Sequence, residues 1–279
     1  MMKSSVILVV LAIGQSFVLF TKNIDVSVGS IMGLSAAVCG MLLTNGYNAF
    51  LSIFTAVMLG AIIGFINGIG VAKFRVPAII MTLGMLGIVR GAMLIFTGGK
   101  WIEDIPNNFK KLSSIVILGL PITVWGVFMI LLLLYFFLRK VPYGRYFYAV
   151  GDNEDGARLI GIPVNQVKIN AFIVSGISAA IAGCIFVMNI GFVPNQTGTG
   201  IELQVIAAAV LGGIHLKGGT GSIFGAALGA LFLEAISSSL VFLKIPAFWN
   251  NAISGFLLLL IIILDSVMKK WKAERRMNL

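Results

Sequence analysis

The sequence predicts an all-α polytopic membrane protein with about nine transmembrane helices. The chain of 279 residues is 59% hydrophobic and only 11% charged, and its mean hydropathy is +1.05. A soluble domain carries about 25% charged residues, so this chain lacks the charge to cover a water-exposed surface. Its apolar residues also form long uninterrupted runs. These observations exclude a cytosolic enzyme, a disordered tail and a disulfide-stapled scaffold.

A helix that crosses a bilayer needs about 20 apolar residues. The candidate spans, in chain order, are Ser5–Phe20, Val26–Leu43, Ala49–Ala72, Val76–Thr97, Ile115–Leu138, Ile169–Phe192, Leu203–Ile214, Ser222–Leu243 and Phe248–Leu264. The seventh is short, rich in alanine and flanked by glycines, so a broken or partly buried helix is expected there. We treat residues 1–279 as one transmembrane domain.

Basic residues predict the orientation of these spans. The tail after Leu264 and the loops in register with it hold 14 of the 20 Lys and Arg residues; these loops are Thr21–Asp25, Lys73–Arg75, Arg139–Lys168 and Leu216–Gly221. Cytoplasmic loops are enriched in Lys and Arg, so we place these segments in the cytoplasm. The net charge of +10 then needs no nucleic-acid partner. Nine spans would leave Met1 outside, and we hypothesise that one N-terminal helix is missing.

Two pairs of segments indicate an inverted internal repeat. Ile24–Val28 resembles Ile201–Val205, and Lys73–Ala78 resembles Leu243–Ala247. In the predicted topology the two units run in opposite directions across the membrane. Inverted repeats are typical of transporters, in which the pathway lies where the halves meet. The alternative is that acidic helix starts and Pro-Ala pairs recur by chance.

The acid that opens each unit has two interpretations. Asp25 and Glu202 both stand at the start of a helix, where a carboxylate favours the positive end of the helix dipole and accepts from free N–H groups. The functional alternative is that they form gates beside the pathway.

The loop 139–168 is the longest polar stretch. Asn153 is a favourable N-cap, Glu154 and Asp155 fall in the first turn, and Gly161 is a natural stop. The sequence therefore predicts a short amphipathic helix in the cytoplasm that can dock into a soluble partner and pass motion to the spans. A simple ordered connector is the alternative.

No motif of catalysis or metal binding is present in the sequence. There is no G-x-x-x-x-G-K-[ST] phosphate loop, and His215 has no Cys partner. Cys39 and Cys184 lie within apolar runs as small buried hydrophobes. We expect no enzyme activity, no metal and no cofactor. Arg90 and Glu234 are the few charges within spans, a thin basis for a proton-coupled carrier, so energy is expected to come from a partner.

Three segments carry a family resemblance. Thr21–Ser30, Gly151–Gly161 and Ala207–Gly221 are similar to the ribose-permease family, the sugar-type permeases of bacterial ABC importers. The resemblance covers nearly the whole chain.

Further segments refine that resemblance. Gly98–Glu103, Asn189–Gly198 and Ile245–Asn250 are most similar to permeases of autoinducer-2 import systems. Permeases for ribose, rhamnose or another monosaccharide remain the alternative.

The resemblance implies a passive subunit of an importer in the bacterial inner membrane. It implies a second permease subunit that forms a heterodimer with this chain, two ABC ATPase subunits, and a periplasmic binding protein that delivers a small hydroxylated ligand. It also implies a coupling segment, whose matching residues are Asn153, Glu154, Gly156, Arg158, Leu159 and Gly161.

Polar residues in or beside small-residue helices are the candidates for contact with the ligand. They are Asn67, Thr82, Asn189, Asn195, Gln196 and Glu202. Each can form a hydrogen bond with a hydroxylated ligand. The alternative for each is a hydrogen bond between helices or a helix cap, often worth about 0.6 kcal/mol in a membrane.

Overall fold

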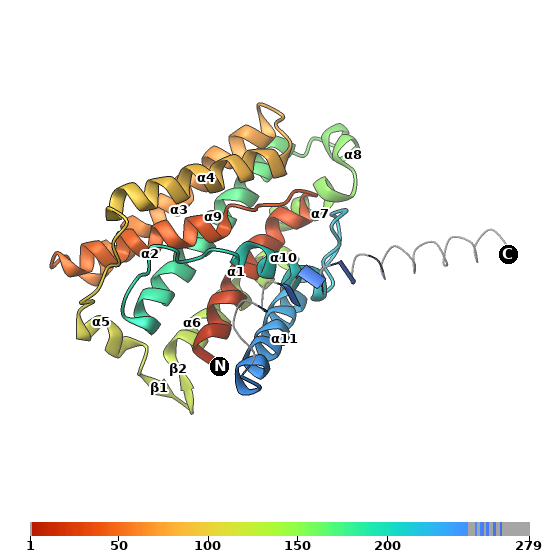
Figure 1. Ribbon diagram of the computed structural model, residues 1–279. Coiled ribbons are helices and arrows are strands. Elements are labelled where there is room, and N and C mark those ends of the chain that lie inside the picture. The colour runs from red at the N-terminus through yellow and green to blue at the C-terminus, as the bar shows by residue number, and fades with distance from the viewer. Residues whose placement is uncertain are drawn as a thin grey trace.

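The protein is a bundle of apolar helices with one small hairpin (Figure 1). The computed structural model describes residues 2–244 and, beyond them, residues 249, 252, 253, 255, 256, 259, 260 and 263. The elements are α1 (Met2–Phe20), α2 (Val28–Thr44), α3 (Ala49–Ala72), α4 (Ala78–Thr97), α5 (Asn107–Leu112), β1 (Val116–Ile117), β2 (Leu120–Pro121), α6 (Ile122–Lys140), α7 (Pro142–Asp152), α8 (Glu154–Leu159), α9 (Val164–Ile190), α10 (Ile201–Leu211) and α11 (Ile223–Phe242).

Five of the described helices are long and apolar enough to cross a membrane. They are α3, α4, α6, α9 and, over Ile223–Leu240, α11. Three predicted spans fall on shorter apolar helices, namely Ser4–Phe20, Val28–Thr44 and Ile201–Leu211. The structure thus confirms an all-helical membrane architecture but gives fewer membrane-length helices than the nine spans predicted. Most of the ninth predicted span, Phe248–Leu264, lies outside the described residues.

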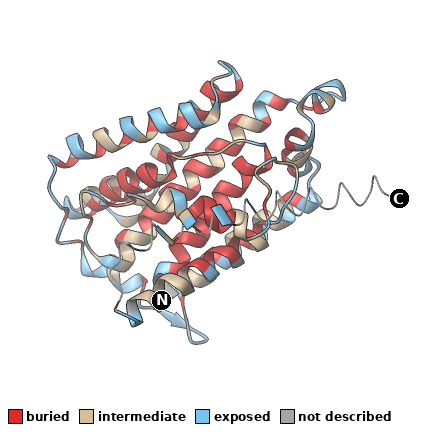
Figure 2. Ribbon diagram, turned by 45° about the vertical axis from the view of Figure 1, so that its right-hand side comes forward, coloured by how far each residue is buried: buried red, intermediate tan, exposed pale blue. Residues whose placement is uncertain are grey.

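The core of the bundle is built from α1, α2 and α9. Every residue from Ser5 to Thr21 is buried, so α1 runs through the middle of the protein (Figure 2). A helix that is hydrophobic all round is expected to be buried on all sides. Helix α9 packs against α1, α2 and α3, and it joins the two halves of the chain.

The outer helices expose large apolar side chains. On α3 these include Phe50, Phe54 and Ile62, and on α6 they include Leu133 and Phe136. Helices α4 and α11 expose similar side chains. A soluble monomer rarely exposes apolar patches larger than a few hundred Å², so lipid is the medium in which this surface is stable.

A glycine stripe brings α3 against α9. Gly60, Gly64 and Gly68 are spaced four residues apart on one face of α3, and their backbones touch α9 at Gly176, Phe172 and Ile169. Without a hydrophobic driving force in lipid, helices associate through such close backbone contacts.

Two features differ from the sequence prediction. The predicted span at Ile115 begins instead with the hairpin β1–β2, and helix α6 starts only at Ile122, because Leu118 and Gly119 adopt left-handed φ values and turn the chain. Helix α7 was not predicted at all, although Pro142 at its first turn is a usual helix start.

A substitution on the α3 stripe tests this packing. A Cβ at Gly64 would overlap the backbone carbonyl of Phe172, whereas a Cβ at Gly84 on α4 would meet nothing within 4 Å. We expect Gly64→Ala to destabilise the folded protein by about 1–3 kcal/mol and Gly84→Ala to leave it unchanged. Thermal unfolding in detergent measures the difference. Equal unfolding temperatures for the two variants would contradict this packing.

Candidate functional site: a basic end, a buried carboxylate and an irregular segment inside the bundle

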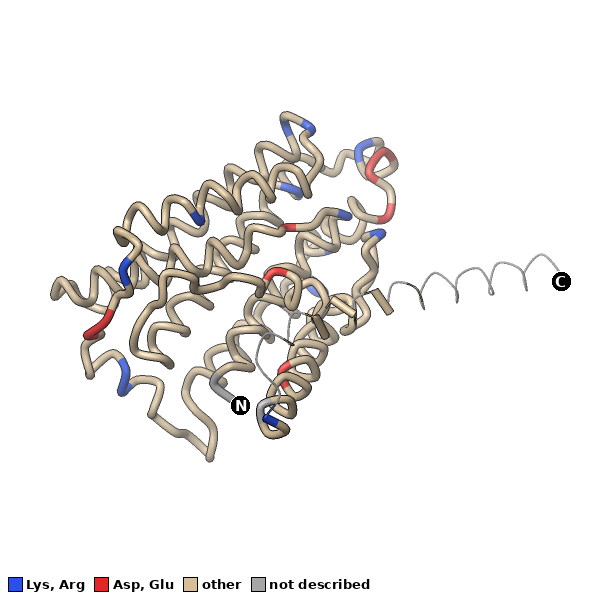
Figure 3. The backbone as a smooth tube through the Cα atoms, in the orientation of Figure 1, with Lys and Arg blue, Asp and Glu red and all other residues tan. Residues whose placement is uncertain are grey.

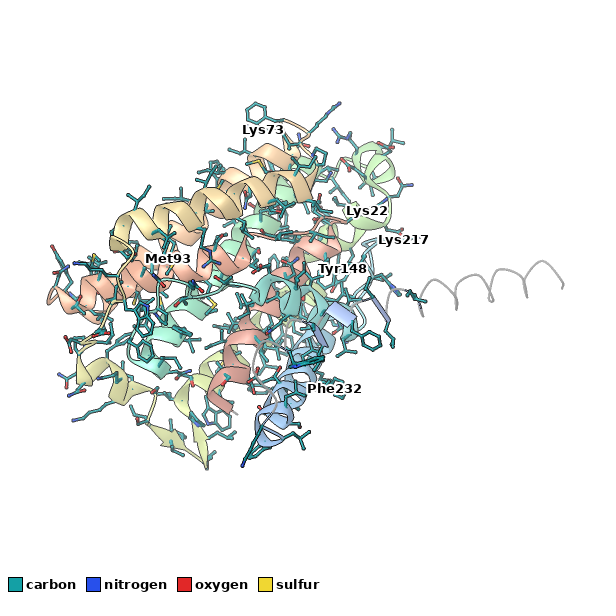
Figure 4. The ribbon with its side chains drawn as sticks, viewed as in Figure 1. Lys22, Lys73, Met93, Tyr148, Lys217 and Phe232 are labelled. Carbon is teal, nitrogen blue, oxygen red and sulfur yellow. The ribbon has the colours of Figure 1, made fainter. Side chains whose placement is uncertain are left out.

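Lys and Arg residues are concentrated at one end of the bundle (Figure 3). Lys22, Lys73 and Lys217 lie at this end (Figure 4), which also holds α7, α8 and the turn between α3 and α4. We call it the basic end. The opposite end carries α5 and the β1–β2 hairpin.

Helix α8 is a short capped helix at the basic end, as the sequence predicts. The side chain of Asn153 accepts a hydrogen bond from the Gly156 amide at 2.8 Å. Glu154 pairs with Arg158 at 3.2 Å and with Lys168 of α9 at 2.6 Å. Burial alone would raise the pKa of Glu154, but the hydrogen bonds and charges of Lys168 and Arg158 outweigh it, so its pKa lies below the ordinary value. The carboxylate therefore stays ionised and ties α8 to α9.

The tip of α8 is apolar and exposed. Leu159 is 89% exposed and Ile160 is 76% exposed, and Gly161 ends the helix with a left-handed φ of 82°. Next to this tip a polar cleft of about 590 Å³ separates α8 from the α3–α4 turn, and Arg75 and Arg158 line it. An apolar tip beside a charged cleft is a surface suited to a protein partner.

Helix α7 connects α8 to the core by direct backbone contact. A Cβ on Gly151 would overlap the carbonyl of Phe20 at the end of α1, and the same carbonyl accepts from the Gly219 amide at 3.0 Å. The rings of Phe20 and Tyr148 lie 4.4 Å apart, and those of Phe17 and Phe147 lie 5.2 Å apart. A displacement of α8 would therefore reach the end of α1.

Five residues beyond Phe20, the fully buried Asp25 lies at the centre of a polar network. Its Oδ1 accepts from the amide and the hydroxyl of Ser27 at 2.9 and 2.6 Å, and its Oδ2 accepts from Ser175 of α9 at 2.9 Å. In the amide orientation that satisfies both of its polar atoms, Gln15 of α1 bonds the backbone N and O of Asp25, each at 3.2 Å. We call these residues, with Asn67 and Thr82, the Asp25 network.

Two of the predicted pathway residues belong to this network. Asn67 of α3 is buried and donates to Ser27 Oγ at 2.9 Å. Thr82 of α4 is also buried and accepts from the Val26 amide at 3.1 Å. Both side chains thus make hydrogen bonds between segments of the chain. This is the alternative to contact with the ligand that the sequence analysis left open for them. Neither Gln15 nor Ser175 was singled out in the sequence, because isolated polar residues in apolar helices carry no distinguishing pattern.

The segment 191–200 descends into the bundle along α2. Val193 pairs with Ile102 and lies beside Gly40, whereas further along the segment Gly198 touches Gly29. Gly40 and Gly29 are eleven residues apart on α2, which is about 16 Å along the helix. The chain then continues from Gly200 as α10, only eleven residues long, and α10 leads into the turn whose Gly218 and Gly219 lie beside Lys22 and Phe20 at the basic end. The seventh crossing therefore consists of an irregular stretch followed by a short helix that begins inside the bundle.

Arg90 of α4 binds the segment 191–200. Its guanidinium donates to the Thr197 carbonyl at 2.8 Å, and it interacts electrostatically with Glu202. Glu202 lies in the first turn of α10 with its Oε2 against Gly29, buried and without a hydrogen-bond partner among the described residues. Irregular backbone at membrane depth occurs only where it is buried in protein or lines a water-filled cavity. In the sequence Arg90 is recognisable as a charge within a span, but no local pattern indicates its role.

The remaining predicted pathway residues lie on the segment 191–200 or just before it. Asn195 donates to the Gly99 carbonyl at 2.8 Å, and Gln196 is exposed. Asn189 is half-buried near the end of α9. The structure thus brings Asn195, Gln196 and Glu202 together around one segment and places Asn67 and Thr82 in the Asp25 network.

Apolar helices of membrane length around a buried irregular segment define an integral membrane protein. The family model described as "branched-chain amino acid transport system / permease component" matches residues 1–262. The chain therefore belongs to this family of permease components.

Named relatives are similar along most of the chain. The "Autoinducer 2 import system permease protein LsrC" of Photorhabdus luminescens is 50% identical over 94% of this chain and 79% of that protein. The proteins of the same name from Escherichia coli O9:H4 (strain HS) and Salmonella paratyphi B are each 49% identical over 94% of this chain, covering 77% and 76% of those proteins. No solved structure matches the chain.

The Asp25 network yields a stability prediction. Asp25→Asn replaces an acceptor with a donor opposite Ser27 or Ser175, so we expect a loss of about 1–3 kcal/mol in folding free energy. Asp155→Asn is the control, because it removes the same charge from an exposed position on α8. Unfolding in detergent measures both, and an Asp25→Asn variant as stable as the control would refute the network's structural role.

Proposed function

We propose that this chain is a permease subunit of an ABC importer and that, with a second and distinct permease, it forms the pathway for autoinducer-2. The observation that carries the proposal is the identity of about 50% with permeases of autoinducer-2 import systems over 94% of the chain. Permease components of this kind are not enzymes, and they reside in the bacterial inner membrane. The energy then comes from separate ATPase subunits, and a periplasmic binding protein delivers the ligand.

Helix α8 is the proposed contact with the ATPase. Its residues Asn153, Glu154, Gly156, Arg158, Leu159 and Gly161 match the coupling segment expected from the family. The exposed tip at Leu159 and Ile160 supports this role, since two neighbouring aliphatic side chains exposed outside the membrane-length helices provide an apolar contact for a partner. The Glu154–Lys168 pair and the contact of Gly151 with Phe20 support transmission to α9 and α1.

The pathway is proposed to run beside the segment 191–200 and the start of α10. Broken helices whose ends meet near the middle of the membrane form the solute sites of many transporters. Asn195, Gln196 and Glu202 remain candidates for contact with the solute, together with Asn189. Asn67 and Thr82 are better placed to act through the Asp25 network, and Asp25 is proposed to act there rather than as an open gate.

The inverted repeat also remains a proposal. Arg75 and Lys244, which occupy matching positions two residues before Pro77 and Pro246, both have a left-handed φ of 56°. This shared backbone conformation at a non-glycine residue supports a common ancestry of the two units. The excess of Lys and Arg at the basic end supports a cytoplasmic location for that end and a periplasmic location for the β1–β2 hairpin.

Reconstitution tests the proposed function directly. Liposomes containing this chain, the second permease and the ATPase are loaded with ATP and supplied outside with the binding protein and labelled autoinducer-2. We expect uptake only in the complete system. Preference for ribose or rhamnose would assign the alternative substrate, and uptake by the chain alone under a pH gradient would replace the proposal with a proton-coupled carrier.

The tip of α8 provides a second prediction. Leu159→Ser with Ile160→Ser removes the apolar contact, so we expect binding of the ATPase subunit and ATP-driven uptake to fall at least ten-fold while the unfolding temperature stays unchanged. Leu118→Ser is the control, because Leu118 is 86% exposed at the opposite end. Uptake and co-purification of the ATPase provide the measurement. Normal coupling in the double variant would show that α8 is not the contact.

A further inference from the structure

A cavity of about 250 Å³ adjoins the segment 191–200. Its lining comes from α1, α2, α9, α10 and α11 as well as from Gly198 and Thr199 of the segment itself. Ile7, Leu8, Met32 and Phe186 supply apolar walls. Small-molecule sites are commonly concave and largely apolar, with a few converging polar groups.

Four polar side chains line this cavity from different elements. Ser4 comes from α1, Thr199 from the segment 191–200, Gln204 from the first turns of α10, and Glu234 from the middle of α11. Glu234 accepts a hydrogen bond from Ser4, which also lines the cavity. No Lys, Arg or His is among the described residues that line it. An ionisable residue within the membrane that faces a cavity points to a functional site.

The chemistry of the lining selects the class of solute. A carboxylate accepts hydrogen bonds from hydroxyl groups, an amide both donates and accepts, and the threonine oxygen accepts, since its own proton goes to the Gln196 carbonyl at 2.8 Å. An anion would meet the carboxylate of Glu234, the one charged side chain among the described residues that line the cavity. The apolar walls suit the carbon skeleton of a small ring.

We propose that this cavity is a binding site for a small uncharged polyhydroxylated solute, held by Glu234, Gln204 and Thr199. The site rests on the proposed transport function, because it lies where the short helix α10 begins inside the bundle and so where the pathway is expected. It adds a carboxylate that neither the family resemblance nor the relatives assign, and it places the solute contact inside one permease subunit.

Protection from chemical labelling tests binding without the need for transport. In the assembled importer, a Thr199→Cys variant is treated from outside with a charged methanethiosulfonate reagent, with and without 10 mM autoinducer-2 or D-ribose. The unsubstituted chain is the control, since Cys39 and Cys184 are buried. We expect labelling of position 199 to slow at least five-fold with solute. Labelling that the solutes do not change, or that only Na⁺ or protons change, would overturn the proposal.

Uptake per ATP hydrolysed tests the role of the carboxylate. Glu234→Gln is expected to lower this ratio at least five-fold while the ATPase rate and the unfolding temperature are kept. Ser239→Ala on the same helix is the matched control, because its hydroxyl only bonds its own helix at the Ala235 carbonyl. An unchanged ratio for Glu234→Gln would overturn the proposal. If the unsubstituted importer moves no solute, the proposed function fails, whereas the labelling result still decides the cavity.

Discussion

The buried carboxylate of Asp25 is the constraint on which the arrangement of the bundle depends. Of the four helices around it, α9 reaches the carboxylate itself through Ser175, and α1 reaches the Asp25 backbone through Gln15. Helix α3 bonds the neighbouring Ser27 through Asn67, and α4 bonds the neighbouring Val26 through Thr82. In a low-dielectric interior the hydrogen bonds of a polar network are strong, and breaking one is costly. Helix packing by glycine contacts brings the helices close, but this network fixes how they are aligned.

The position of this network explains how a partner at the surface could move the core. Asp25 is five residues from Phe20, and Phe20 is where Gly151 of α7 presses on the end of α1. In the proposed coupling, a displacement of α8 would pass through α7 to the segment at which these four helices are hydrogen-bonded. Packed cores move between discrete arrangements rather than deforming continuously, so a single lever suits the two-state motion of an importer.

The sequence predicted what depends on local pattern. Long apolar runs located the apolar helices, although only five described helices are long enough to cross a membrane. Asn153 with Gly161 located α8 within a residue or two. Contacts between distant residues could not be predicted in this way: Arg90 and Thr197 are 107 residues apart, and Asp25 and Ser175 are 150 apart. Asn67 and Thr82 were predicted beside the solute because a polar residue in a span looks alike whether it bonds a ligand or another helix. Helix α7 was missed because aromatic residues that pack against Phe17 and Phe20 have no strong helical signature of their own.

The proposed coupling requires that a separate ATPase subunit binds this chain at α8. Cross-linking at Leu159 tests it most directly: a Leu159→Cys variant in the purified complex, treated with a short thiol-reactive bifunctional reagent, is compared with Leu118→Cys at the opposite end. The account predicts a covalent product with the ATPase subunit from position 159 alone, formed at a rate that changes when ATP binds. A product from position 118, or none from position 159 in a complex that still imports solute, would contradict it.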